Sequence, residues 1–129
     1  MRNNKTLHLS LKKEWYNMIE SGVKTEEYRE IKPYWLKRML MVINFDHTHY
    51  EKIDDNCSQF YCKHIEHLKS DLSIGGFKPK HYDLVQFSYG YTKRNMTFEL
   101  DSINIGKGNK EWGAPENDVF ILKLGKRIE

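Results

Sequence analysis

The sequence predicts an α+β fold in which a small β-barrel of about five strands carries two or three flanking helices. Three observations predict it: apolar residues alternate along residues 6–11, recur at helical spacing along residues 11–19, and alternate again through the last third of the chain. A length of 129 residues suits one domain, so we expect a single domain over residues 1–129. Pairing of the first and last strands would close the barrel and remove its exposed edges.

A strand and a helix open the chain. Alternating leucines predict a half-buried strand over residues 6–11. The period then changes, because the apolar side chains at positions 11, 15, 18 and 19 share one helix face. Ser10 fits as the N-cap of this helix, and Gly22 follows it at the position of a left-handed C-cap.

The middle of the chain is less regular. Pro33 predicts the first turn of a second helix, whose apolar side chains at positions 35, 36, 39 and 40 share one face. Residues 41–45 either extend this helix or begin a strand. Residues 46–79 are polar, and we interpret them as a partly helical insertion between barrel strands. One helix is predicted over residues 59–72, and the two glycines at positions 75–76 stop it.

The last third supplies three more strands. Alternation predicts them over residues 82–91, 96–105 and 119–124, and Gly90 is expected at a bend or bulge. A loop with three glycines and a tryptophan, residues 106–113, lies between the second and third of these strands.

Composition and charge exclude some classes of protein. The net charge of +3 is far from that of a polybasic protein and permits a phosphate-bearing partner without requiring one. No stretch approaches the roughly 18 apolar residues of a membrane helix, and the N-terminus lacks the apolar core of a signal peptide. Cys57 and Cys62 fit a reducing compartment. We expect a cytoplasmic protein with no membrane partner and no cofactor.

Residues 22–29 concentrate ionisable side chains. Glu27 and Arg29 face one side of an extended segment and Lys24 the other, but a turn or bulge at its start brings Lys24 onto the same side. Held together, the three groups shift one another's pKa values and can bind an anion or a base edge, or move a proton. The alternative is a solvated edge strand with surface ion pairs.

The same segment resembles the signature GxKxxExR of the ASCH domains, a family of PUA-like β-barrels. The matching residues are Gly22, Lys24, Glu27 and Arg29. The resemblance covers residues 6–40 and 82–125 and leaves out the insertion. It implies a PUA-like barrel that binds RNA or a modified nucleotide in a cleft lined by the signature residues.

Some bacterial proteins that resemble this chain are amidohydrolases that deacetylate N4-acetylcytidine with a lysine, a threonine and a distant glutamate. The resemblance maps that lysine to Lys24 and places Glu27 at the threonine position. It leaves Glu111 or Glu116 as the distant glutamate. The implied alternative function is a small amidohydrolase acting on an acylated nucleoside, with Glu27 as general base and Lys24 as its electrostatic partner.

Three aromatic residues, Trp35, Tyr91 and Trp112, flank the motif and the glycine loop. Exposed rings there would stack on bases, at about 1–3 kcal/mol per base. The alternative is that all three are core residues. Lys93 and Arg94 follow Tyr91 and either contact phosphates or lie in a turn.

The insertion also concentrates side chains that can bind metals. Imidazole and thiolate suit zinc, but the spacing matches no standard zinc finger. We expect no metal site, and a zinc-supported interaction module is the alternative. The residues concerned are His47, His49, Cys57, Cys62, His64 and His67.

Overall fold

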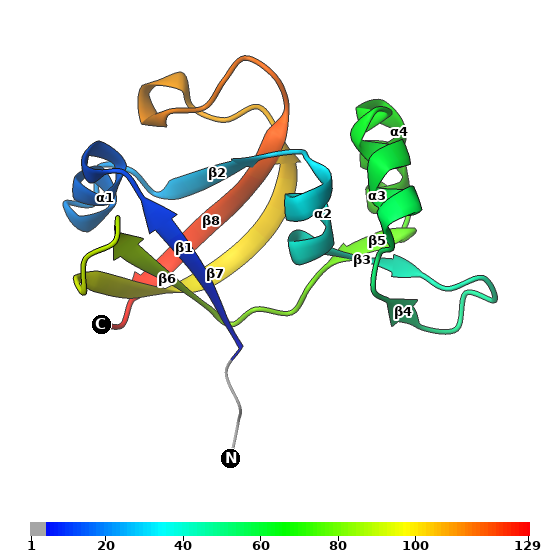
Figure 1. Ribbon diagram of the computed structural model, residues 1–129, viewed down its shortest axis with the longest axis horizontal. Coiled ribbons are helices and arrows are strands. Elements are labelled where there is room, and N and C mark those ends of the chain that lie inside the picture. Colours follow the sequence, from blue (N-terminus) through cyan, green and yellow to red (C-terminus); the bar gives the residue numbers. More distant parts are fainter. Residues whose placement is uncertain (1–4) are drawn as a thin grey trace.

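A five-stranded sheet, curled into a half-barrel, dominates the computed structural model, which describes residues 5–129 (Figure 1). Neighbouring strands follow the order β1-β6-β7-β8-β2. β1 and β6 run parallel, and the other neighbours run antiparallel. In chain order the strands are β1 (Thr6–Leu11), β2 (Glu26–Glu30), β6 (Leu84–Tyr89), β7 (Asn95–Gly106) and β8 (Val119–Arg127). The α+β class and the expected number of about five strands in the main sheet are confirmed.

The predicted closure of the barrel by its first and last strands is wrong. β7 and β8 are consecutive and pair with each other, which places β8 inside the sheet and leaves β1 and β2 as its edges. A side chain connects these edges instead of a ladder of backbone bonds, because Arg29 Nη2 on β2 donates to the carbonyl of Ser10 on β1 at 3.1 Å.

Two helices pack against the half-barrel: α1 (Lys13–Glu20) and α2 (Pro33–Met39). Each buries one face, with Tyr16 of α1 and Leu36 of α2 fully inaccessible to solvent. Pro33 opens α2 as predicted. The predicted Ser10 cap of α1 is wrong, because Ser10 still belongs to β1 and Lys12 occupies the N-cap without a side-chain bond. Gly22 has the expected left-handed backbone, with φ +85°.

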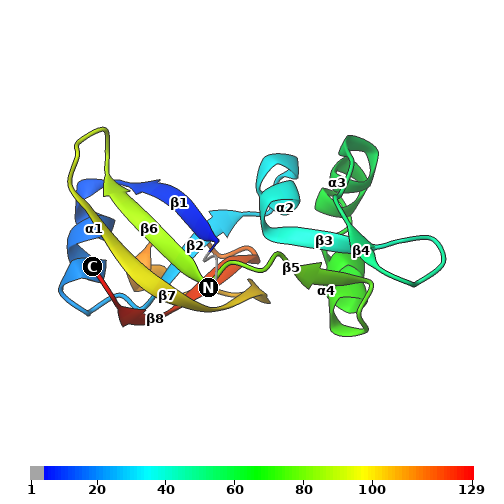
Figure 2. The ribbon, with the colours of Figure 1, turned by 90° about the horizontal axis from the view of Figure 1, so that it is seen from below.

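Residues 40–79 form a small lobe beyond α2, with a three-stranded sheet in the order β4-β3-β5 (Figure 2). The lobe therefore begins before the predicted insertion at residues 46–79. Its core side chains continue the core of the half-barrel, with Ile53, Leu68 and Phe77 in the same apolar cluster. Its elements are β3 (Leu40–Ile43), β4 (Tyr50–Glu51), α3 (Asp55–Cys62), α4 (Ile65–Ser73) and β5 (Phe77–Pro79).

Two expectations for this lobe are settled by its backbone. Residues 41–43 are a strand rather than an extension of α2, because the backbone already becomes extended at Leu40 (φ −124°, ψ 160°). The single helix predicted over residues 59–72 is wrong. The helix is interrupted at residues 63–64. There the Phe60 carbonyl accepts a hydrogen bond from the Lys63 amide at 3.1 Å and lies 2.8 Å from the His64 ring Nδ1. Residues 5–129 therefore contain four α-helices, more than the two or three predicted.

Within residues 5–129, no helix combines the length and the apolar character that crossing a membrane requires.

Candidate functional site

The charged motif lies where α1 turns into β2. Lys24 precedes the strand, and its backbone amide donates to the carbonyl of Met18 at 3.0 Å. This turn places the Lys24 side chain on the same side as Glu27 and Arg29 of β2, which matches the turn considered for the motif. The structure therefore brings the three ionisable residues of the motif together.

Glu27 lies between the two cations. Its Oε1 is 3.1 Å from Lys24 Nζ, and its Oε2 pairs with Arg29 Nη1. The side chains of Lys24, Glu27 and Arg29 are 1%, 6% and 15% exposed, so a solvated edge strand is not what forms here. Burial lowers the pKa of the Lys24 amine, and the nearby Glu27 carboxylate opposes that shift.

All three tryptophans of the chain line one cavity of about 470 Å³ together with this motif. We call it the tryptophan cavity. Trp15 comes from α1, Trp35 from α2 and Trp112 from the loop between β7 and β8. The cations lie against the rings: Lys24 Nζ is 5.0 Å from the Trp15 centroid, and Arg29 Cζ is 5.1 Å from that of Trp35.

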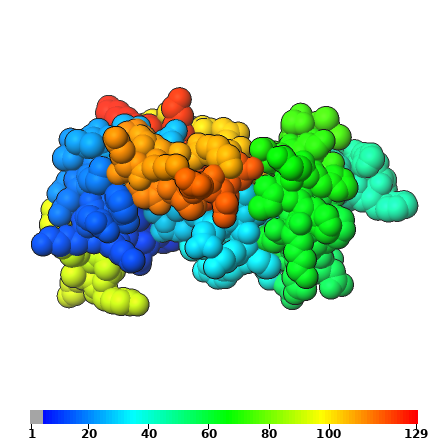
Figure 3. All heavy atoms as spheres, turned by 90° about the horizontal axis from the view of Figure 1, so that it is seen from above, coloured from blue at the N-terminus to red at the C-terminus, as the bar shows by residue number. Residues whose placement is uncertain are grey.

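One wall of the tryptophan cavity is the loop of residues 107–118, which contains the short 3₁₀ helix η1 (Lys110–Trp112). The loop lies between the N-terminal elements and the small lobe (Figure 3). It is bonded to the motif at two points. Lys24 Nζ donates to the Trp112 carbonyl, and the Asn109 amide donates to the Tyr28 hydroxyl at 3.0 Å.

Tyr28 is held from both sides. Its hydroxyl accepts from the loop and donates to Glu26 Oε1 at 2.8 Å. Burial, as the main cause, raises the pKa of Tyr28 to about 12. Tyr28 is therefore a neutral structural support for the loop over the physiological pH range.

Two glycines let the loop approach the site closely. A Cβ at Gly108 would lie 2.7 Å from the Tyr28 ring and 2.5 Å from Ala114 Cβ. Gly113 has φ +95°, and a Cβ there would lie 2.9 Å from the Trp15 ring. The glycine loop of the sequence is thus a packing surface against Tyr28 and Trp15.

Some residues singled out from the sequence lie elsewhere. Tyr91 is fully exposed in the turn after β6 and does not line the tryptophan cavity. Arg94 pairs with Glu20 of α1 at 2.5 Å. Neither Glu111 nor Glu116 lines the cavity, and Glu116 pairs with Lys110 at 2.7 Å. The structure therefore does not bring a distant carboxylate from this loop to Lys24.

Sequence reasoning missed two aromatic residues that line the tryptophan cavity, Trp15 and Tyr28. Trp15 fits the apolar face of α1 by its spacing, and that face also turns toward Lys24. Tyr28 follows Glu27 in β2, so alternation places its side chain on the opposite face of the strand. Its ring nevertheless lies 4.8 Å from Lys24 Nζ. The available signal was that Trp15 lies on the helix face that precedes Lys24 and that Tyr28 follows Lys24 by four residues.

The possible metal ligands of the lobe do not converge. Within the described residues, no group of three or more His, Cys, Asp or Glu side chains is placed to hold a metal ion. His64 stacks on Phe60 with ring centroids 4.3 Å apart. Cys57 and Cys62 pack against the core, and burial raises the pKa of both thiols, which disfavours the thiolate that binds metals. His47 and His49 lie in the turn between β3 and β4.

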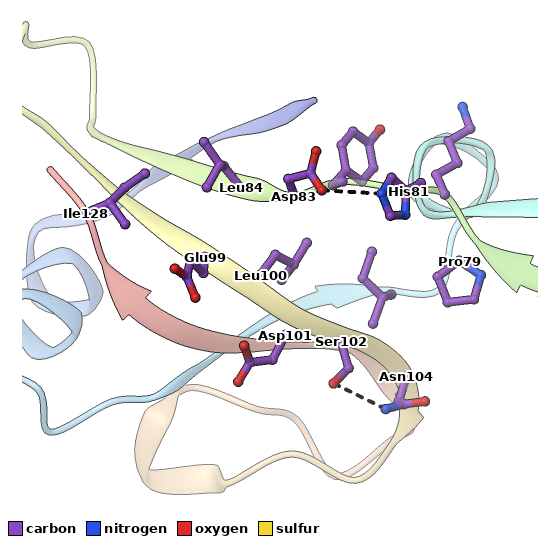
Figure 4. Close-up of a pocket in the computed structure, with 13 residues that line it drawn as sticks. Pro79, His81, Asp83, Leu84, Glu99, Leu100, Asp101, Ser102, Asn104 and Ile128 are labelled. Atoms are coloured by element: carbon purple, nitrogen blue, oxygen red, sulfur yellow. Dashed lines mark hydrogen bonds and ion pairs between the residues drawn. The ribbon is translucent and has the colours of Figure 1, made fainter. Parts of the chain in front are cut away.

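A larger cavity of about 790 Å³ lies along β7 beside the segment that joins β5 to β6 (Figure 4). Its lining includes three carboxylates, those of Asp83, Glu99 and Asp101, and His81 Nε2 is 3.3 Å from Asp83 Oδ1. We call it the acidic cavity. Lys80 lines the acidic cavity as well, so a cation lies beside these carboxylates.

No protein-family model matches this chain, and no curated protein or solved structure matches it either.

Proposed function

We propose that this chain binds RNA or a modified nucleotide in the tryptophan cavity, as an ASCH-type, PUA-like domain. The observation that carries the proposal is the convergence of all three tryptophans, from three separate segments, on Lys24, Glu27 and Arg29. The GxKxxExR resemblance of residues 22–29 supports it, because the matching side chains are the ones that converge.

The chemistry of the cavity suits a nucleotide. An indole face such as that of Trp35 stacks on any base, at about 1–3 kcal/mol per base. The Arg29 side chain lines the cavity and is 15% exposed, and its guanidinium is a donor group suited to a base edge or a phosphate. Two exposed lysines that also line the cavity, Lys12 and Lys32, provide charge for a phosphate group.

A comparison of two aromatic substitutions tests the proposal. We expect Trp35→Ala to weaken the binding of a nucleoside monophosphate by about 1–3 kcal/mol in calorimetry, because a stacking surface is lost. Tyr91→Ala removes a fully exposed aromatic ring outside the cavity and serves as the control. The proposal is wrong if both variants bind like the original protein, or if no nucleotide or RNA binds at low salt.

The second candidate function is hydrolysis of an acylated nucleoside such as N4-acetylcytidine. The specific observation in its favour is the lowered pKa of Lys24 beside the Glu27 carboxylate, since such pairs occur at catalytic centres. A panel of acylated nucleosides, followed by chromatography, tests it. Turnover that persists in Lys24→Ala would exclude the mechanism, and binding without turnover would leave only the binding function.

A further inference from the structure

Three cationic side chains gather at one end of the small sheet in the lobe. β3 pairs with β4 through Val42 and Glu51, and with β5 through Leu40 and Pro79. The residues that follow β4 and β5, and the last turn of α2 that precedes β3, therefore meet at the same end. They contribute Lys52, Lys80 and Arg38, which we call the basic cluster.

The basic cluster is not neutralised by the protein. Within residues 5–129, none of its three members forms an ion pair with a carboxylate, and the buried Nε of Arg38 has no hydrogen-bond partner. Lys80 lies close to the other two: burial first, and then repulsion from Lys52, Arg38 and also Lys5, lowers the pKa of its amine. Like charges held together without partners favour a bound anion.

Helix α2 joins the basic cluster to the tryptophan cavity. Arg38 Cζ lies 5.9 Å from the ring centroid of Trp35, whose ring also meets Arg29 of the cavity. Tyr34 lies between the two regions: its ring is 4.8 Å from that of Trp35 and 5.5 Å from Arg38 Cζ, and the residue is 58% exposed. An exposed aromatic ring is therefore followed directly by cations.

Alternating rings and cations of this kind are how proteins hold single strands, with bases on the rings and phosphates on the cations. We propose that the ligand is a single-stranded nucleic acid several nucleotides long, which enters the tryptophan cavity with one nucleotide and crosses α2 over Tyr34 to the basic cluster. This inference rests on the proposed function and adds that the substrate class is a polynucleotide rather than a free nucleotide.

The acidic cavity sets the end of this path. Lys80 lines the acidic cavity together with Asp83, and Glu99 and Asp101 of β7 line the same hollow (Figure 4). A phosphate backbone is attracted as far as Lys80 and repelled beyond it. The strand therefore occupies the surface from the tryptophan cavity to the basic cluster and no further.

The test compares a nucleoside monophosphate with a single-stranded RNA of about eight nucleotides, a length within the usual range of compact single-strand binding folds. Each phosphate neutralised by the protein adds about 0.7 to the slope of log affinity against log salt for single strands. We expect the triple variant Arg38→Gln, Lys52→Gln, Lys80→Gln to reduce the slope for the RNA by about 2, and we expect mononucleotide binding to be unchanged in the double variant Lys52→Gln, Lys80→Gln.

Two further variants keep the test decisive. Lys52→Gln with Lys80→Gln leaves Arg38 packed on its rings, and should lower the slope by about 1.4 if the triple variant fails to fold. The control is Lys63→Gln, Lys123→Gln, Lys126→Gln, which removes the same charge from exposed positions outside both cavities and should leave the slope as it is.

The outcomes separate this inference from the proposed function. An RNA slope that the basic-cluster variants do not change, with mononucleotide binding intact, overturns the inference and leaves the proposed function standing. RNA binding that depends on the basic cluster but not on Trp35 overturns the proposed function. If the control variant reduces the salt slope of RNA binding as much as the basic-cluster variants do, only the net charge of the protein matters. This result also overturns the inference.

Discussion

At the scale of single residues, Glu27 balances two buried cations. It pairs with both Lys24 and Arg29, and all three side chains are largely removed from water. Breaking a buried ion pair leaves an uncompensated charge, which costs far more than breaking a pair at the surface.

We therefore expect Glu27→Gln to lower the free energy of unfolding by about 3–5 kcal/mol, measured by urea denaturation. Glu30→Gln is the matched control on the same strand, because Glu30 pairs with Lys32 at 3.1 Å while both side chains remain about two-thirds exposed. Its cost should be below about 1 kcal/mol. Similar costs for the two variants would contradict the burial of the Glu27 charge.

The Tyr28 hydroxyl makes the stability of the folded protein depend on pH at alkaline values. Its pKa is raised from 10.0 to about 12 in the folded protein. The neutral phenol therefore contributes stability that is fully present below pH 10 and is lost as the pH rises through about 12.

We expect Tyr28→Phe to lose less stability than the original protein between pH 10 and 12, measured as the free energy of unfolding at each pH. Tyr91→Phe alters a fully exposed ring and should follow the original protein across the same range. Identical pH profiles for Tyr28→Phe and Tyr91→Phe would show that the loop does not hold the Tyr28 phenol as described.

At the scale of elements, the loop of residues 107–118 completes the site by packing on β2 and α1. Gly108 allows this packing, because a Cβ there would meet Tyr28 at 2.7 Å. Gly106 of β7 is the natural comparison, since a Cβ there would make only an ordinary contact of 3.6 Å with Ile121. Neither position has a positive φ, so the difference between them is one of space.

Gly108→Ala should lower the free energy of unfolding by about 1–3 kcal/mol and weaken nucleotide binding, because the loop must move away from Tyr28. Gly106→Ala should change both quantities little. Denaturation and calorimetry on the two variants provide the check, and equal binding by both would mean that the loop is not part of the site.

The elements that the sequence predicts well are those with local signals. The strands over residues 6–11 and 119–124 follow from alternation, and Pro33 marks the start of α2. Which strands are neighbours depends on contacts between distant segments, so periodicity predicted a closed barrel where the sheet has edges at β1 and β2. The break at residues 63–64 was missed because the apolar spacing continues across it.

Part of the site could be predicted because its signals are local in the sequence. The spacing of Lys24, Glu27 and Arg29 and the turn at Gly22 are local, and the structure brings these charges together. The approach of Trp15 to Lys24 and the position of Tyr91 away from the cavity depend on how α1 and the β6–β7 turn pack. A single sequence carries no direct signal for such packing.

At the scale of the whole molecule, the net charge of +3 conceals a strong separation of charge. The basic cluster adjoins α2, and Lys80 of that cluster borders the carboxylates of the acidic cavity, which it helps to line. Such a separation orients a polyanion before contact, and it favours binding along one surface. Under the inferred binding of a single strand, the lobe of residues 40–79 contributes Lys52 to the binding surface, and Lys80 follows the lobe directly.

The tryptophans allow the most direct test of the central claim, because the only three in the chain all line the proposed site. The measurement is a titration of the ¹⁵N-labelled protein with a nucleoside monophosphate, followed through its indole N–H signals in NMR. Binding in the tryptophan cavity predicts that the Trp35 and Trp112 indole signals shift together with the backbone signals of Glu27 and Arg29. Saturation with all three indole signals unmoved, or no binding at all, would contradict the claim.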